Sequence, residues 1–194
     1  MQIRLATLND IPAVLTLHQR YHLSSISTDD LAHGFVTTAF TTAQLQHLIE
    51  EENGLVIACD GDAVVGYTMA ASWDYWSQWP IFLHMIAGLP YVNFHGQPLT
   101  VENSYQYGPV CIDRDYRGSG LLAQMFEYSR RQMAPRYPYL VTFINKKNLR
   151  SFAAHTRKIG LEVIAEFQFN DNEFYELAYS TAQPLNIDSN SNVN

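Results

Sequence analysis

The segment Arg117-Gly118-Ser119-Gly120 lies between an apolar run that ends at Ile112 and a stretch with the periodicity of an amphipathic helix. Glycine has no Cβ, so two glycines around a serine let a ligand come close to the main chain. The free amides of the first helical turn point at such a ligand, and the helix dipole favours an anion there. The segment therefore predicts a site for a phosphorylated ligand.

Other chemistry fits the same residues less well. Gly118-x-Gly120-x-x-Ala123 matches the dinucleotide fingerprint, but the first glycine does not directly follow the strand and the later run 137–145 has no acid. No Gly-Lys-Ser/Thr follows, which excludes a P-loop. Ser119 is not in a Gly-x-Ser-x-Gly elbow, and Cys111 has no basic neighbour on its own strand, so neither is favoured as a nucleophile.

His18 and His22 are one helical turn apart, which is the spacing of two metal ligands on a helix. No glutamate follows the first histidine directly and no third ligand is in view, so a packed or solvated helix face is the favoured interpretation. No metal is expected.

The charges are divided unevenly along a chain of net charge -7. Ten of the 12 basic residues lie between Arg114 and Lys158, whereas only Asp115 and Glu127 of the 19 acidic residues do. This division indicates an anionic ligand at the basic segment and a cationic partner elsewhere, or else two solvated basic helix faces. Nucleic acid is disfavoured, because the chain is acidic and its basic residues are not interleaved with an aromatic platform.

The length of 194 residues favours a single domain, expected over residues 1–182, with a disordered tail over 183–194. The two cysteines lie in apolar runs, which argues against a disulfide framework. There is no apolar signal core at the start, and the apolar stretch 80–92 is too short to cross a bilayer. We expect a cytoplasmic protein that does not associate with membranes.

The order of expected elements is a strand, two helices, three strands, a helix, a strand, a helix and two strands, which predicts a mixed α/β sheet. Gly108-Pro109 interrupts the strand 104–112, where a bulge or a splayed edge is expected because proline cannot donate to a ladder. A long aromatic insertion occupies residues 73–98.

With VCIDRDYRGSGLLAQM followed by NLRSFAAHTRKIGLEVI, the chain resembles the GNAT N-acetyltransferases. The resemblance covers nearly the whole chain. It implies a mostly antiparallel sheet of about seven strands, splayed in the middle and flanked by about four helices. Two positions depart from the family pattern: Leu122 replaces a small residue, and His155 stands where many members have tyrosine.

The resemblance further implies that acetyl-coenzyme A is the co-substrate. The backbone of the strand end would pair with the pantetheine arm, the amides from Arg117 to Leu122 would hold the pyrophosphate, and the next helix would face the arm. The residues implied are Val110, Cys111, Ile112, Arg117, Gly118, Ser119, Gly120, Leu121, Leu122, Asn148 and Ser151.

The implied activity is transfer of an acetyl group to a primary amine of a small molecule or peptide by direct attack of the amine. His155 is the candidate acid for the leaving thiolate, with simple packing as the alternative. The family's glutamate base corresponds here to Gln106, which can only orient a water, so Glu102, counted onto the same strand face, is the candidate base. The alternative function is a non-catalytic coenzyme A-binding sensor or interaction module.

The insertion is expected on the acceptor side. Its aromatic side chains can attract a cationic amine, with two tyrosines of strand 104–112 in a water network. The alternative is that these rings fill a second small core or cover a homodimer face. The candidate acceptor residues are Trp73, Tyr75, Trp76, Trp79, Tyr105 and Tyr107.

Overall fold

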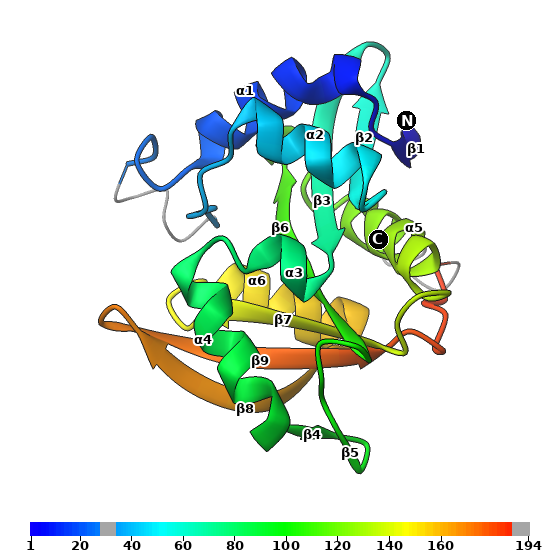
Figure 1. The fold of residues 1–194 in the computed structure, drawn as a ribbon. Coiled ribbons are helices and arrows are strands. Elements are labelled where there is room, and N and C mark those ends of the chain that lie inside the picture. The colour runs from blue at the N-terminus through cyan, green and yellow to red at the C-terminus, as the bar shows by residue number, and fades with distance from the viewer. Residues whose placement is uncertain (28–33, 188–194) are drawn as a thin grey trace.

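The computed structural model describes residues 1–27 and 34–187, which form a seven-stranded sheet with helices on both faces (Figure 1). Every neighbouring pair of strands is antiparallel except β6 and β7, which are parallel. The mixed, mostly antiparallel sheet predicted from the sequence is confirmed. In spatial order the strands are β1 (Gln2–Leu5), β2 (Leu55–Asp60), β3 (Ala63–Ala71), β6 (Ser104–Ile112), β7 (Tyr139–Asn145), β9 (Asn172–Ser180) and β8 (Glu162–Phe169).

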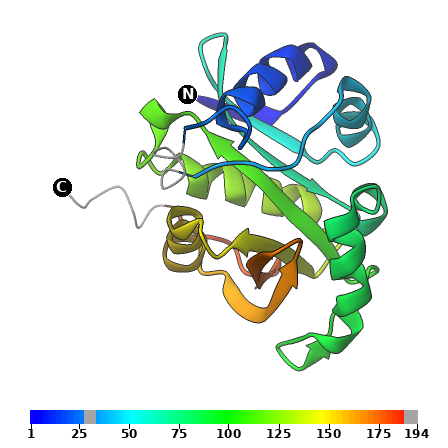
Figure 2. The ribbon, with the colours of Figure 1, turned by 90° about the vertical axis from the view of Figure 1, so that its left-hand side faces the viewer.

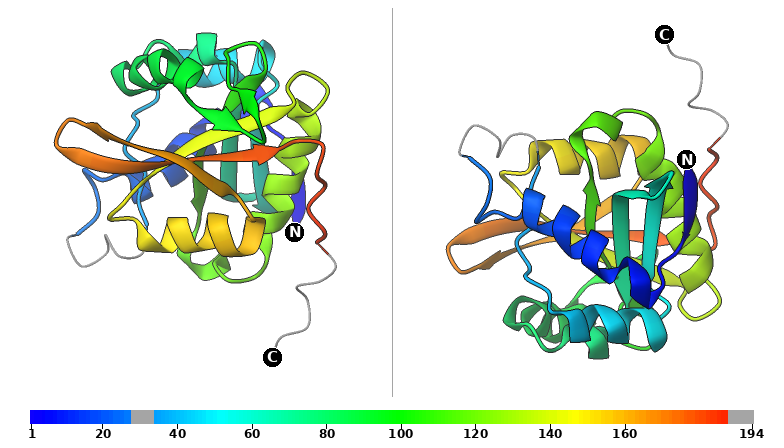
Figure 3. Two further views of the ribbon diagram at one scale, coloured as in Figure 1. Left: turned by 90° about the horizontal axis from the view of Figure 1, so that it is seen from below. Right: turned by 90° about the horizontal axis from the view of Figure 1, so that it is seen from above.

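Four helices share the main hydrophobic core on one face of the sheet, and two cover the other face (Figure 3). The first four are α1 (Ile11–Tyr21), α2 (Thr42–Glu50), α3 (Trp73–Trp76) and α4 (Pro80–Gly88). The other two are α5 (Leu121–Met133) and α6 (Leu149–Ala153), the latter continued by the π-helical turn η5 (Ala154–Ile159). We name these the α1 face and the α5 face of the sheet.

The helix starts follow local rules. The Thr41 hydroxyl accepts a hydrogen bond from the Gln44 amide (3.2 Å), and the Gln44 side chain accepts one from the Thr41 amide (2.8 Å). This capping box fixes the start of α2, as the spacing of the two residues predicts.

The insertion 73–98 forms α3, α4, the short turn η3 (Leu89–Tyr91) and a small hairpin of β4 (Asn93–Phe94) and β5 (Gln97–Pro98) along one side of the sheet (Figure 2). Trp73, Tyr75 and Trp76 are at most 3% exposed, and the Trp73 indole N–H donates to the Ser104 hydroxyl (3.0 Å). The expectation that these three side chains contact the acceptor is therefore not supported, and the core-filling alternative fits them, although the core they join is the main one on the α1 face.

The segment after β9 is held against the α5 face. The Leu185 amide donates to the Glu127 carboxylate, which also forms a bidentate ion pair with Arg130. Leu185 packs on the buried cluster beneath α5. The expectation of a disordered tail over 183–194 is therefore wrong at Leu185, which is bonded and packed. Residues 188–194 lie outside the described part of the chain.

Within residues 1–27 and 34–187, no helix combines the length and apolarity needed to cross a bilayer.

Candidate active site

The parallel strands β6 and β7 separate partway along their length. They pair only over Ser104–Gln106 and Tyr139–Val141, and beyond this point β6 runs upright in Figure 1 while β7 crosses the view. The divergence coincides with a cis Gly108-Pro109 peptide and with a register shift between Thr68 and Ala70 of β3. The interruption predicted at this dipeptide is confirmed.

The second half of β6 presents one unpaired edge to this opening. On its other side, Tyr67 of β3 pairs with Cys111, and the Asp113 amide donates to the Val65 carbonyl (2.8 Å). Backbone groups alternate in direction along a strand, so Cys111 also faces β3, whereas Val110 and Ile112 face the opening.

Two backbone carbonyls of β6 at the opening already accept hydrogen bonds from side chains. The Arg117 Nε donates to the Ile112 carbonyl (2.8 Å), and the Thr142 hydroxyl donates to the Tyr107 carbonyl (2.6 Å). The predicted pantetheine-pairing strand is therefore open at Val110, while the backbone of Cys111 is used by β3.

The opening leads to the N-terminus of α5. Gly118 (φ 87°) and Gly120 (φ 82°) both adopt the left-handed conformation that favours glycine, and both are exposed with Ser119 between them. A Cβ at Gly118 would meet no atom within 4 Å. The first turn of α5 contains no acidic side chain. No carboxylate of this turn therefore competes with an anionic ligand for its free amides and the positive end of the helix dipole. Leu121 and Leu122 begin this turn.

Arg117 supports the loop and does not offer its own amide. That amide donates to the Arg114 carbonyl (3.2 Å), and the guanidinium lies 4.7 Å from the centre of the Tyr21 ring. The Tyr21 hydroxyl in turn accepts from the Arg114 amide (2.8 Å). The prediction that the Arg117 amide helps to hold the pyrophosphate is corrected: this residue connects the loop to α1.

On the other side of the opening, Asn148 and Ser151 lie at the start of α6. The Asn148 side chain caps the helix by accepting from the Ser151 amide (3.2 Å). The His155 Nδ1 lies 2.8 Å from the Ser151 carbonyl, which can only accept, so Nδ1 carries the proton. The ring centre is 6.0 Å from that of Tyr107, and burial lowers the pKa of His155. The imidazole is therefore neutral at pH 7, with its lone pair at Nε2.

The sequence-predicted residues of β6 divide between the two faces. Gln106 pairs with Val141 and lies on the α1 face, where its Nε2 donates to the Tyr107 carbonyl (2.7 Å) and its buried Oε1 has no partner among the described residues. Tyr105 and Tyr107 are fully buried on the α5 face, and burial raises the pKa of both. They belong to the core beneath α5.

The expected position of Glu102 is wrong. A turn ends before β6 begins: the Thr100 hydroxyl accepts from the Glu102 amide (3.2 Å), and the Asn103 side chain accepts from the Thr100 amide (2.8 Å). Glu102 is exposed in this turn, at the end of β6 opposite to the opening. The structure gives it no place beside Gln106.

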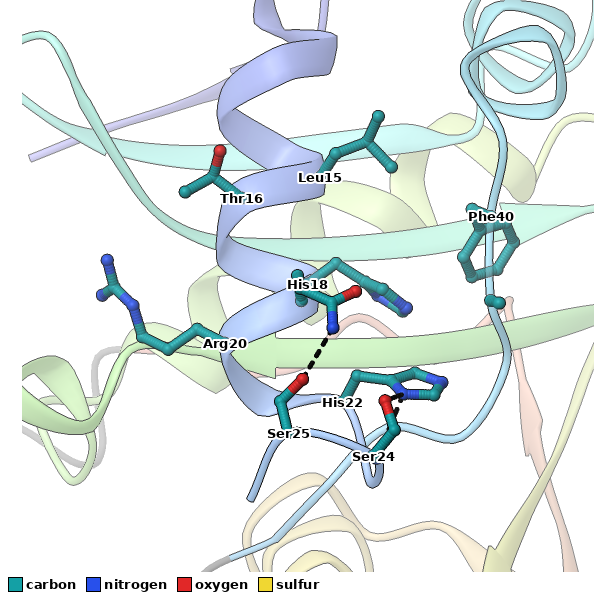
Figure 4. A pocket seen from close by; sticks show the side chains of 10 residues that line it. Leu15, Thr16, His18, Arg20, His22, Ser24, Ser25 and Phe40 are labelled. Carbon is teal, nitrogen blue, oxygen red and sulfur yellow. Dashed lines mark hydrogen bonds between the residues drawn. The ribbon is translucent and has the colours of Figure 1, made fainter.

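A cavity of about 930 Å³ lies between the C-terminal half of α1 and the segment that carries Phe40 (Figure 4). The rings of His18 and His22 point toward that segment, and the Phe40 ring lies 5.4 Å from the half-buried Trp79. The His18 Nδ1 is 2.6 Å from the hydroxyl of the buried Tyr67. The aromatic insertion thus contacts Phe40, which lines this cavity.

Both histidines are engaged with protein groups. The two ring nitrogens of His22 contact Ser24 (2.8 Å) and the Thr37 carbonyl (3.1 Å). Burial lowers the pKa of His18 to about 4. Among the residues that the structure describes, no group of three or more potential metal ligands is found.

Two residues near the opening, Thr142 and Glu176, are not singled out by the sequence pattern. Glu176 is 5% exposed, its Oε1 has no partner among the described residues, and burial raises its pKa to about 7. A signal was present, because Glu176 is the single acid within the otherwise apolar and aromatic run 174–179. Thr142 carries no comparable local signal.

No protein-family model matches the chain, and a search of curated proteins found no match. Solved structures do match it. They include yncA from Salmonella typhimurium with its cofactor acetyl-CoA (TM-score 0.61, 15% identity, 93% of this chain and 94% of that one). Another is the acetyltransferase of the GNAT family from Streptococcus pneumoniae (TM-score 0.61, 12% identity, 92% and 98%). A third is ribosomal-protein-alanine N-acetyltransferase from Brucella melitensis (TM-score 0.58, 20% identity, 93% and 99%).

The chain therefore has the GNAT fold, and the resemblance indicated by its sequence motifs is confirmed at the level of the fold.

Proposed function

We propose that this protein is an N-acetyltransferase that moves the acetyl group of acetyl-coenzyme A to a primary amine of a small molecule or peptide. One observation carries the proposal: the unpaired edge of β6 leads directly to the exposed amides at the N-terminus of α5. A molecule with amide groups along an extended arm and a diphosphate at one end fits this sequence of sites, and coenzyme A is such a molecule.

The geometry supports a role for each residue of the proposed site. Val110 pairs with the arm as a neighbouring strand would, and the amides from Gly118 to Leu122 receive the diphosphate. Asn148 and Ser151 border the arm from α6. The exposed basic side chains of Lys147, Arg150, Arg157 and Lys158 add attraction for the anionic ligand, each by about 0–1 kcal/mol.

The reaction requires an unprotonated amine, a polarised thioester and a proton for the departing thiolate. We propose that His155 transfers this last proton to the thiolate. Its Nδ1–H is held by the Ser151 carbonyl, so Nε2 can take a proton from the attacking nitrogen and pass it to sulfur. Gln106, with a free Oε1 on the α1 face, orients the acceptor or a water and cannot act as a base.

The test is a thermal-shift titration with coenzyme A. Ligand at about 100 times its dissociation constant stabilises the protein by about 2.7 kcal/mol, a shift of about 5–10 °C for a domain of this size. Gly120→Glu removes the shift by placing a carboxylate where the diphosphate binds. Gly96→Glu is the matched control, because Gly96 has the same kind of backbone (φ 80°) at the open tip of the β4–β5 hairpin.

Equal responses from both variants and the parent would show that the ligand does not bind at α5. Thiol release from acetyl-coenzyme A with a panel of amines then separates the enzyme from the alternative. Saturable coenzyme A binding with no turnover on any amine would favour the non-catalytic sensor. Gln106 keeps this alternative open, because its amide stands at the position of the family's glutamate base and cannot accept a proton.

A further inference from the structure

Glu176 is a buried carboxylate that takes no part in the proposed diphosphate site at the N-terminus of α5 or in the proton transfer by His155. It lies on β9, where it pairs with Phe143 of β7 and Ala165 of β8. Glu176 is 5% exposed, and its Oε1 has no hydrogen-bond partner among the described residues. Burial disfavours the ionised form of a carboxylate, and an oxygen left without a hydrogen bond inside the protein is a position where a cationic ligand can supply the missing contact.

The strand register places Glu176 beside the opening. The last pair between β6 and β7 is Gln106 with Val141, and Phe143, two residues further along β7, lies on the same face and at the unpaired edge. Glu176 is the neighbour of Phe143 on the next strand. It is thus one strand spacing, about 4.8 Å, behind the edge of the opening, on the α1 face that Gln106 also occupies.

The surroundings of Glu176 suit an organic cation. Along β9 its neighbours on the same face are Phe174 and Ala178. The Phe143 ring centre lies 5.5 Å from that of Phe174 and 5.6 Å from that of Phe82 on α4. Aromatic faces attract an ammonium group, and a carboxylate among them supplies its counter-charge.

Two other titratable groups on the packed elements have contacts of their own. Glu162 of β8 is exposed and lies 2.9 Å from His95, and the His84 ring of α4 lies 5.4 Å from that of Phe167. Burial is the single cause that raises the pKa of Glu176 to about 7. This value suits proton exchange at neutral pH.

We propose that Glu176 binds the amino group of the acceptor and takes its proton, and that the acceptor is a primary amine carried on an apolar or aromatic group. The inference rests on the acetyltransferase function proposed above. The ammonium gives one proton to the Glu176 carboxylate, and the amine nitrogen forms its bond to the acetyl carbon. The carbon–sulfur bond then breaks, and the thiolate takes the second proton from the nitrogen through His155. Glu176 returns its proton to water.

The experiment measures thiol release from acetyl-coenzyme A with 2-phenylethylamine as the acceptor, between pH 5.5 and 9. For the parent, kcat/KM rises through an ionisation near pH 7. Glu176→Gln lowers kcat/KM by about 10²- to 10⁴-fold and loses this ionisation. Glu176→Asp keeps a carboxylate and recovers part of the rate. Glu173→Gln, an exposed glutamate of the same strand, is the matched control and keeps the parent's profile.

Coenzyme A thermal shifts on the same samples separate the two proposals. If coenzyme A causes no thermal shift in the parent, the proposed function itself is refuted. A normal shift together with an unchanged rate and pH profile in Glu176→Gln would overturn the role of Glu176 alone. A parent that shows the shift but neither binds nor acetylates 2-phenylethylamine would overturn the inferred acceptor class.

Discussion

Replacement of Glu176 by glutamine should make the protein more stable above neutral pH. The pKa of this carboxyl is raised from 4.5 to about 7 in the folded chain. Between these values the folded state holds a proton that the unfolded state has released. By linkage, stability falls as the pH rises through this window, and the cost is complete above pH 7.

The size of the effect follows from the shift. A difference of about 2.5 pKa units at about 1.36 kcal/mol per unit gives an upper value of about 3 kcal/mol. Glutamine has nearly the shape of the protonated carboxyl and does not ionise. Glu176→Gln should therefore match the parent near pH 4.5 and exceed its free energy of unfolding by up to about 3 kcal/mol at pH 8.

Urea denaturation at pH 4.5, 6, 7 and 8 measures the difference between the two proteins. Burial lowers the pKa of His18 to about 4, which weakens both proteins equally as the pH falls below 6.5, so this contribution cancels in the difference. The exposed Glu173 provides the control, since Glu173→Gln should show no comparable trend. A Glu176→Gln difference that stays constant from pH 4.5 to 8 would mean that the carboxylate is solvated, and the burial argument would fail.

Two further substitutions test the packing of the fold. Gly54→Ala should destabilise by about 1–3 kcal/mol or more, because a Cβ there would lie 1.7 Å from the Ala70 carbonyl oxygen; Gly88→Ala, with open space around it, should be neutral or stabilising in the same thermal melts. Arg130→Met should cost about 3–5 kcal/mol in urea denaturation, because it leaves the buried Glu127 carboxylate without its bidentate partner; a loss below about 1 kcal/mol would show that this ion pair is effectively solvated.

The parts of the site that depend on local backbone chemistry were predictable from the sequence. Gly118 and Gly120 adopt the left-handed conformation at a helix start, and Gly108-Pro109 interrupts its strand. In each case the residue type limits its own backbone, so a short window of sequence carries the information.

The misplaced residues depend on longer-range or competing interactions. Glu102 was assigned by counting along an assumed strand, but the side chains of Thr100 and Asn103 bind the local backbone and end the turn just before Ser104. The core position of Trp76 depends on α4, which brings the Phe82 ring to 4.7 Å from it. No spacing rule encodes a contact between separate helices and a sheet.

The opening between β6 and β7 also explains why side chains gather along its edge. An unpaired backbone group in a partly buried strand is costly, so a strand that leaves its neighbour needs substitute partners. Thr142 supplies one to the Tyr107 carbonyl, and Arg117 supplies one to the Ile112 carbonyl. Val110 faces the opening between them, at a backbone position that neither side chain covers. We therefore expect a bound arm to pair with the backbone of Val110, because the neighbouring carbonyls of Tyr107 and Ile112 already accept hydrogen bonds.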